Sequence, residues 1–212
     1  EVIRLSGINL VIDDIDMPLI IKVASIPKER IQVYFIDNEE YFKRKSTFSD
    51  ENGKLHEDND ERAMFFAKGV IETVKKLNWS PDIIHIHGWM ASLFPLYLKT
   101  YYKDEPVFEN SKIVTSIYDK SFNESLNKKL VDKILFDEIN EDLIKGLRDP
   151  SYNNLMKSAI DFSDALILGS EDIPKEVLDH IKKSDKPILD YQTRETFSEA
   201  YTEFYKNEVL NQ

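Results

Sequence analysis

The chain has 212 residues, 42% of them hydrophobic, which is enough for one good-sized core, so we expect a single domain over residues 1–212. Lys and Arg number 28 against 39 Asp and Glu, and the net charge of -11 makes nucleic acid and anionic membranes unsuitable partners. No apolar run approaches the roughly 20 residues that span a bilayer, and the absence of cysteine excludes disulfides and thiol nucleophiles and fits a cytoplasmic location.

Three runs rich in β-branched residues open the chain, at 2–12, 18–25 and 31–36. The acidic segment Asp13–Asp16 separates the first two, and together the runs predict an antiparallel excursion of strand, turn, strand, turn and strand. The aspartates of this segment lack the glycine and the downstream glutamate of a calcium loop. We interpret them as a solvated turn.

A polar loop and a long helix are predicted next. Residues 37–57 are largely polar, with a short helical turn expected at Glu39–Phe42. Asp58 is predicted to cap the following helix, with Glu61 at the capping-box position. Apolar residues recur at helical spacing from there to residue 77, which predicts a helix of about five turns.

Strands and helices alternate from residue 59 onward, which predicts an α/β fold with a parallel sheet flanked by helices. Such sheets bind ligands outside the carboxyl ends of their strands. His87, Gly88 and Trp89 lie at one such end, 116–119 at the next and 170–171 at a third. The expected strands are 83–87, 112–117 and 165–170, and the expected helices are 91–102, 123–147, 151–162, 173–182 and 195–209.

His85 and His87 face the same side of the predicted strand, because side chains alternate along a strand. They could therefore chelate a metal, but a catalytic zinc needs a third ligand, and only an acid such as Asp119 is available nearby. We favour the interpretation that places His85 within the strand and His87 at the mouth of a cleft. Gly88 then lets the backbone turn before a helix N-terminus whose N–H groups face an anion. No metal and no cofactor are expected.

Phosphate-binding glycine motifs are absent, since no two of the six glycines form a G-x-G. No G-x-S-x-G elbow is present either. The tyrosines at 97, 101 and 102 could stack on sugar rings, although aromatic residues at helical spacing more often pack in the core. The residues alone therefore predict an α/β domain with a cleft, and they leave its chemistry open.

Several stretches resemble the N-terminal lobe of bacterial glycogen synthases and plant starch synthases. They are "YFIDNEEYF" (34–42), "PDIIHIHGW" (81–89), "KIVTSIYD" (112–119) and "LMKSAIDFSDALILGS" (155–170). The family pattern Y-x-D-x-x-x-Y-F, D-N-x-x-R-F and P-D-I-x-H-x-H-D-W-H is matched in order by Tyr34, Asp37, Tyr41, Phe42, Asp58, Asn59, Arg62, Pro81, Asp82, Ile83, His85, His87 and Trp89.

This resemblance implies a glucosyltransferase built from two Rossmann-like lobes, in whose cleft ADP-glucose meets a growing α-1,4-glucan such as glycogen. The substrate-binding residues that it implies here are His87, Gly88, Trp89 and Tyr118. The choice between ADP-glucose and UDP-glucose belongs mainly to the C-terminal lobe of the family.

The sequence departs from the family at four cleft positions. The acid and second histidine of H-D-W-H are Gly88 and Met90, and the histidine and asparagine that follow the next strand are Ile117 and Tyr118. We expect all four positions to have lost their polar role, because a glycosyl transition state needs oriented hydrogen bonds to developing charge. Asp119 is the one candidate to replace the missing acid.

Two pieces of the family's catalytic unit are not found in the sequence. A first strand, loop and helix with a Lys-x-Gly-Gly loop would precede Glu1, and the C-terminal lobe would begin near residue 178. Residues 195–212 instead resemble the helix that closes back on the N-terminal lobe. The resemblance thus implies a transferase that needs a companion protein or a homo-oligomer for its second lobe. The alternative is a non-catalytic descendant that binds α-glucan or regulates glycogen metabolism.

Overall fold

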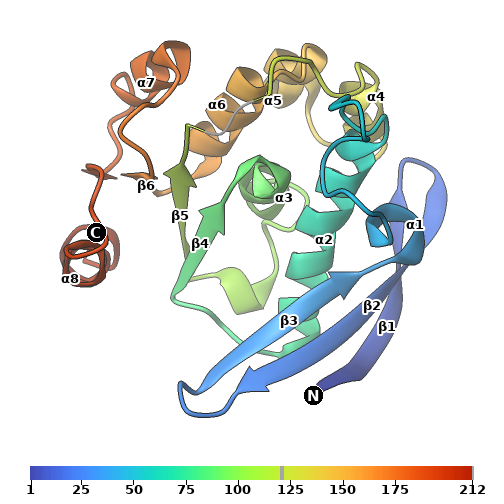
Figure 1. Cartoon of the computed structure of the whole chain (residues 1–212), viewed down its shortest axis with the longest axis horizontal. Helices are drawn as coiled ribbons and strands as arrows, with labels where there is room; N and C mark the ends of the chain where they lie inside the picture. Colours follow the sequence, from blue (N-terminus) through green and yellow to red (C-terminus); the bar gives the residue numbers. More distant parts are fainter. Residues whose placement is uncertain (120–121, 212) are drawn as a thin grey trace.

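The computed structural model describes residues 1–119 and 122–211. Two sheets organise this part of the chain: a three-stranded sheet of order β1-β2-β3 and a four-stranded sheet of order β4-β5-β6-β7 (Figure 1). Helix α2 packs between the antiparallel sheet and helix α3. The predicted α/β class, with a parallel sheet flanked by helices and an antiparallel sheet near the N-terminus, is confirmed.

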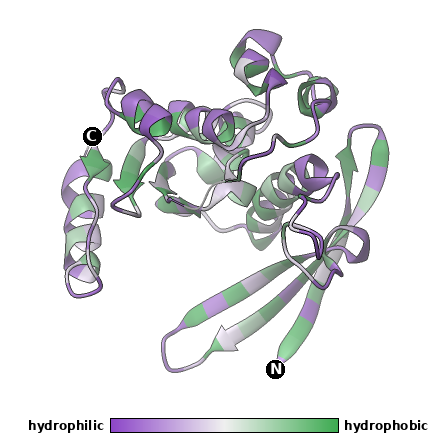
Figure 2. Cartoon of the chain, turned by 45° about the horizontal axis from the view of Figure 1, so that its top comes forward, coloured by the Kyte–Doolittle hydropathy of each residue, from purple (hydrophilic) through white to green (hydrophobic). Residues whose placement is uncertain are grey.

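The antiparallel sheet consists of β1 (Val2–Ile12), β2 (Ile15–Ile26) and β3 (Ile31–Asp37). The second strand begins earlier than predicted, because the turn is only two residues long and Asp13 takes a left-handed φ of 61°. Apolar and polar residues alternate along these strands (Figure 2). One face supplies core residues such as Leu10, Leu19 and Ile21, so this sheet is held in place by its packing on α2.

Helix α1 (Glu39–Phe42) and helix α2 (Asn59–Leu77) lie close to their predicted positions. The predicted capping box is wrong. The Asp58 carboxylate forms an ion pair with Arg44 and makes no side-chain cap hydrogen bond, while Glu61 accepts from the hydroxyl of Tyr41 and from Lys133. Long-range partners therefore replace the local caps that the sequence pattern indicates.

The parallel sheet comprises β4 (Ile83–His87), β5 (Lys112–Ile117), β6 (Ala165–Leu168) and the unpredicted two-residue β7 (Ile188–Leu189). Register pairs His85 with Val114 and His87 with Ser116. Laterally paired residues of a sheet point to the same face, so both histidines share the face of Val114 and Ser116. That face carries the smaller core cluster, which the C-terminal helix completes with Phe204 and Val209.

The helices after β4 are shorter than predicted. The segment at 91–102 is a 3₁₀ turn (Trp89–Ala91) followed by α3 (Phe94–Lys99), and Pro95 fits the first turn of a helix but not its interior. The segment at 123–147 divides into α4 (Leu130–Leu135), α5 (Glu141–Ile144) and a 3₁₀ turn (Lys145–Arg148). Glu138 interrupts it with a φ of 58°, and the side chain of Asn140 caps a new helix.

The last three helices are α6 (Tyr152–Phe162), α7 (Lys175–Ile181) and α8 (Phe197–Phe204), and a π-helical turn (Tyr205–Val209) continues α8. Earlier in the chain, a 3₁₀ turn (Pro106–Phe108) precedes β5. Helices α3 and α6 contribute to the larger core, on the sheet face opposite to that of α8 (Figure 1). No helix in the described part of the chain combines the length and apolar character needed to cross a bilayer.

Candidate functional site

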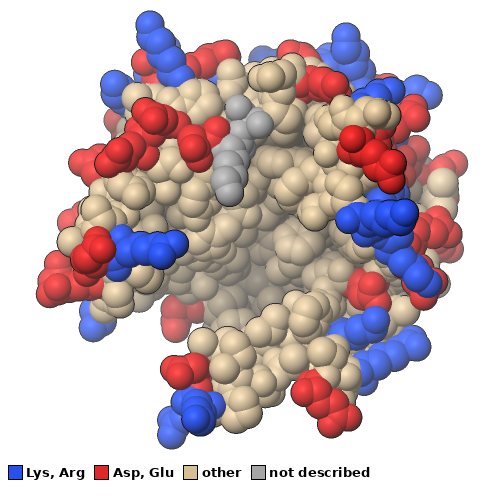
Figure 3. Space-filling view, in the orientation of Figure 1, with Lys and Arg blue, Asp and Glu red and all other residues tan. Residues whose placement is uncertain are grey.

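A cleft of about 600 Å³ lies at the carboxyl ends of β4 and β5, where the sequence predicts a ligand site. This volume is within the range of small-molecule sites in proteins. Figure 3 shows a face whose hollowed centre is poor in charged side chains, which gather at its rim. The cleft is lined by Phe48, Ser49, Gly53, Leu55, His87, Gly88, Trp89, Met90, Ser116, Tyr118, Phe122, Asn123, Glu124, Tyr152 and Met156.

Two neighbouring histidine rings lie on one face of β4, as predicted. The ring centroids of His85 and His87 are 4.0 Å apart. His85 uses both nitrogens: Nε2 lies 2.7 Å from Oγ of Ser116, and Nδ1 lies 2.5 Å from the hydroxyl of Tyr205. His87 Nδ1 lies 2.6 Å from the hydroxyl of Tyr118. The nitrogen Nε2 of His87 has no partner among the described residues.

Both imidazoles are neutral at neutral pH. Burial, and then the charge of nearby His87, lower the pKa of His85 from 6.5 to about 3. His87 is exposed at the cleft mouth, but it loses enough surrounding water for desolvation to lower its pKa as well. With both nitrogens hydrogen bonded, His85 has no lone pair for a metal, and the described residues contain no cluster of three or more metal-binding side chains.

Tyr118 is fixed from three sides. Its hydroxyl bonds to His87, and its backbone carbonyl accepts a 2.7 Å hydrogen bond from the hydroxyl of Tyr152. Its ring lies against Gly169, where an added Cβ would be only 2.5 Å from a ring carbon. Tyr118 thus makes a polar contact with His87 in the cleft, while the expected loss of a polar role toward the substrate at this position stays a prediction. Ile117, also expected to face the cleft, is fully buried in the core instead.

The two other substituted positions line the cleft without offering polar side chains. Gly88 has a φ of 76°, and an added Cβ there would meet nothing within 4 Å. Open space therefore lies where the side chain of the family's acid would begin. Asp119 does not line the cleft; it is exposed, and its Oδ1 accepts a 3.0 Å hydrogen bond from Ser170 at the end of β6.

Aromatic rings form one wall of the cleft. Trp89 is only 8% exposed, and its ring centroid lies 5.0 Å from that of Phe48 and 5.1 Å from that of Phe122. Phe122 in turn contacts Tyr152 at 5.8 Å. Trp89 thus supports the wall through packing more than it offers a ring face to a ligand.

The tyrosines of the α3 region do not form a sugar platform. Tyr97 and Tyr102 are buried, and only Tyr101 is exposed, at 51%. The hydroxyl of Tyr97 donates to the buried carboxylate of Asp137. The core-packing interpretation is therefore correct for Tyr97 and Tyr102.

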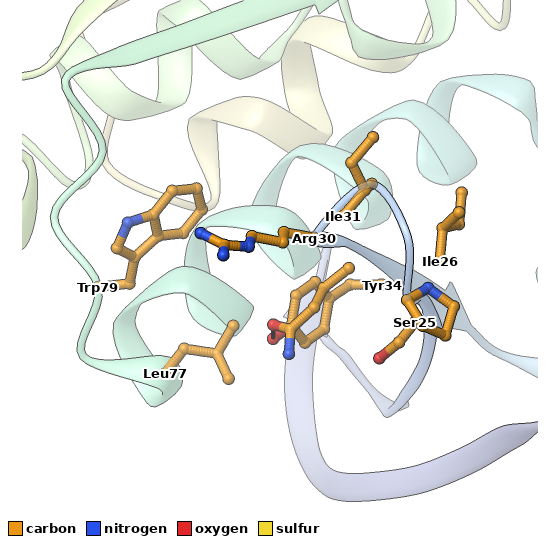
Figure 4. A pocket seen from close by; sticks show the side chains of 9 residues that line it. Ser25, Ile26, Arg30, Ile31, Tyr34, Leu77 and Trp79 are labelled. Atoms are coloured by element: carbon orange, nitrogen blue, oxygen red, sulfur yellow. Dashed lines mark hydrogen bonds between the residues drawn. The ribbon is translucent and has the colours of Figure 1, made fainter.

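A second hollow of about 690 Å³ lies between the β2–β3 hairpin and the end of α2 (Figure 4). Arg30 extends there toward the exposed ring of Trp79, near Tyr34. Arg30 is the only charged residue among the described residues that line it. Because no polar groups converge as they do around His87, we place the candidate site at the carboxyl ends of the strands.

Sequence reasoning missed Tyr205 as a partner of the cleft histidines, together with Phe48, Phe122 and Tyr152. The spacing of Phe197, Tyr201 and Tyr205 predicts that they share one helix face. The ring centroid of Tyr201 lies 5.8 Å from that of Phe197 and 6.2 Å from that of Tyr205. The alternation that puts both histidines on the face of Ser116 could have identified this serine. No local pattern connects residue 205 with residue 85.

Comparison with known proteins now identifies the family. The model of the starch synthase catalytic domain matches residues 2–186. The glycogen synthase of Chlorobium luteolum is 36% identical over 179 residues, covering 84% of this chain and 36% of the relative. That of Chlorobium limicola is 40% identical over 147 residues, covering 69% and 30%. The chain thus spans about a third of the length of these relatives.

Among solved structures, the catalytic domain of starch synthase IV from Arabidopsis thaliana bound to ADP and acarbose is similar to this chain. The TM-score is 0.70 at 14% sequence identity, and the match covers 91% of this chain and 41% of that one. This likeness supports the fold, and the sequence matches give the membership. The chain belongs to the starch synthase catalytic domain family and corresponds to its N-terminal part.

Proposed function

We propose that this chain is one lobe of a glucosyltransferase that moves glucose from ADP-glucose to an α-1,4-glucan. The observation that carries the proposal is the cleft at the ends of β4 and β5, in which a neutral histidine keeps one ring nitrogen without a protein partner among the described residues. Family membership supports the reaction type. ADP and acarbose, bound to the structurally similar starch synthase IV, are natural first ligands to test.

The chemistry explains why a neutral His87 suits this reaction. The bond between glucose C1 and the nucleotide diphosphate breaks, and the diphosphate takes the electron pair. The acceptor hydroxyl forms the new C1–O bond, and its proton passes to the departing diphosphate or to water. The sugar ring gains positive charge in the transition state. A neutral imidazole donates a hydrogen bond without repelling that charge, whereas an imidazolium would oppose it. Gly88 and Met90 offer no such bond, and we assign this role to His87, whose Nε2 has no partner among the described residues.

We further propose that transfer requires a second lobe, because the chain covers about a third of the glycogen synthases that it matches. That lobe would come from a longer gene product, from a companion protein or from a second copy of this chain. The chain by itself would bind the glucan and contribute His87. The cytoplasmic location and the independence from a cofactor stay predictions.

Calorimetric titration with maltoheptaose, acarbose, ADP, ADP-glucose and UDP-glucose tests the binding part of this proposal. We expect saturable maltoheptaose or acarbose binding that His87→Ala weakens at least about tenfold, the value of one good hydrogen bond to a ligand. Tyr101→Ala is the matched control, since it removes an exposed ring outside the cleft lining. Equal loss in both variants, or binding indifferent to His87→Ala, would contradict the assignment of the cleft.

A non-catalytic α-glucan-binding role is the second candidate, and the apolar positions Gly88 and Met90 favour it. It predicts retention on immobilised glycogen without glucose transfer by the full-length gene product. It also predicts that ADP-glucose does not compete with the glucan. Competition between ADP-glucose and maltoheptaose would favour the transferase.

A further inference from the structure

The outer face of the antiparallel sheet is both apolar and exposed at one end. Helix α2 packs on the inner face, where Leu19 and Ile21 belong to the core. Side chains alternate along a strand, so the register of β1, β2 and β3 also identifies the residues that point outward. Figure 2 shows the end of this sheet extending away from the helices. The outward apolar side chains at that end are Val2, Ala24, Ile26, Ile31, Val33 and Phe35.

These side chains form one continuous patch. Ile26 pairs with Ile31 at the end of the hairpin, and the next outward row joins Val2, Ala24 and Val33 across all three strands. The five large side chains of the patch are between 36% and 54% exposed. Half of the exposed large hydrophobic side chains in the described part of the chain lie in these three strands. Single exposed apolar residues are ordinary on a protein surface, whereas a contiguous patch marks an interaction site.

The composition of this face differs from that of a solvated sheet face. An antiparallel sheet with one face in water normally carries polar residues on that face. Strand propensity does not explain the exception, because threonine also favours strands and would be polar. The opposite end of the same outer face does include polar residues, namely Asn9, Asp16 and Asp37. The apolar end is therefore suited to being covered by another apolar surface.

The outer face also carries no net charge. Its charged residues are two cations, Arg4 and Lys22, and two anions, Asp16 and Asp37. Nζ of Lys22 lies 2.5 Å from Oδ2 of Asp37. The whole chain has a net charge of -11, so two copies of it repel each other on average. Two copies that meet through this face avoid that repulsion at the point of contact.

We infer that this face is the interface of a homodimer, in which the patch of one copy packs against the same patch of a second copy. A two-fold symmetric interface uses one surface twice, so that surface must be compatible with itself, as an apolar and uncharged patch is. Sheets that pack face to face lie about 10 Å apart and interdigitate their side chains. None of the patch residues lines the cleft, so the inference does not depend on the proposed function.

Size-exclusion chromatography with light scattering tests the inference on the purified full-length gene product. We expect the wild type to have twice the monomer mass at about 50 µM, because interfaces of ordinary size give micromolar or tighter affinity. Val33→Lys places an unpaired cation in the interface in each copy. It should weaken the dimer at least about a hundredfold and give the monomer mass. Val33 is exposed in the single chain, so we expect this variant to fold.

Leu143→Lys is the matched control, because it introduces the same cation at an exposed apolar residue of α5, outside the sheet. This variant should keep the dimer mass. Ile31→Lys, on the same patch, replaces Val33→Lys if circular dichroism shows that the latter is unfolded. The inference is overturned by a monomeric wild type, by a dimer that persists in the folded patch variant, or by equal dissociation of Leu143→Lys.

Discussion

Acidification should destabilise this protein through His85. The half-buried ring has a pKa of about 3 in the folded chain against an ordinary value of 6.5. As the pH falls below about 6.5, the unfolded chain binds a proton that the folded chain does not. The stabilisation is therefore fully present above that pH, and it is lost progressively as the pH falls toward 3.

The magnitude follows from the same two values. The free energy of unfolding should fall by about 2 kcal/mol near pH 5 relative to pH 8, and the loss should approach about 5 kcal/mol below pH 3. For a chain of this size, 2 kcal/mol corresponds to a decrease in melting temperature of roughly 4–8 °C. Other titrating groups contribute as well, so the informative quantity is the difference between the wild type and a variant without the imidazole.

His85→Gln is that variant, because its amide can still bond to Ser116 or Tyr205 without titrating. Urea unfolding of both proteins at pH 8, 6 and 5 gives the comparison, and the difference between them at pH 8 measures the packing and hydrogen bonding that the neutral ring contributes. We expect the wild type to lose about 2 kcal/mol more than His85→Gln between pH 8 and pH 5. Parallel pH profiles would refute the conclusion that His85 is buried as a neutral group.

Lys133→Met should lower the free energy of unfolding, measured in urea, by about 3–5 kcal/mol, because it leaves the fully buried Asp60 without its cation. The control Lys99→Met, at a half-exposed ion pair, should lower it by less than about 1 kcal/mol. Similar losses in the two variants would contradict this ranking. Gly169→Ala should displace the Tyr118 ring, lower stability by about 1–3 kcal/mol and weaken maltoheptaose binding. The control is Gly146→Ala, whose added Cβ would enter open space, and it should leave the melting temperature and the binding unchanged. A Gly169→Ala variant with the stability and the maltoheptaose affinity of the wild type would contradict the prediction.

The sequence contains enough local information to predict most of the strands. Alternation and β-branched runs predict β1, β3, β4 and β5 at or within one residue of their bounds, and the switch from antiparallel to parallel strands follows from the spacing of the helices. The two-residue β7 has no such signal, because its hydrogen bonds to β6 are tertiary. Residues 123–147 are helical in pattern, but the left-handed Glu138 divides them.

The site shows the same division between local and long-range information. The position of His87 at the end of a parallel strand follows from its place in the sequence. The role of Tyr118 does not, because its hydroxyl reaches a residue on the neighbouring strand. Tyr205 lies 120 positions after His85, and only the packing of the C-terminal helix on the sheet brings them together.

Transfer of labelled glucose from ADP-glucose to glycogen by the purified full-length gene product, with His87→Ala and Tyr101→Ala measured beside it, tests the proposed function most directly. We predict incorporation above a no-enzyme control in the wild type and in Tyr101→Ala, and a loss of at least about a hundredfold in His87→Ala, as for removal of an oriented transition-state donor. Incorporation that His87→Ala leaves unchanged would contradict the role of this cleft in glucosyl transfer. Glycogen binding with no incorporation would contradict transfer by this gene product alone and would favour a companion protein or the glucan-binding role.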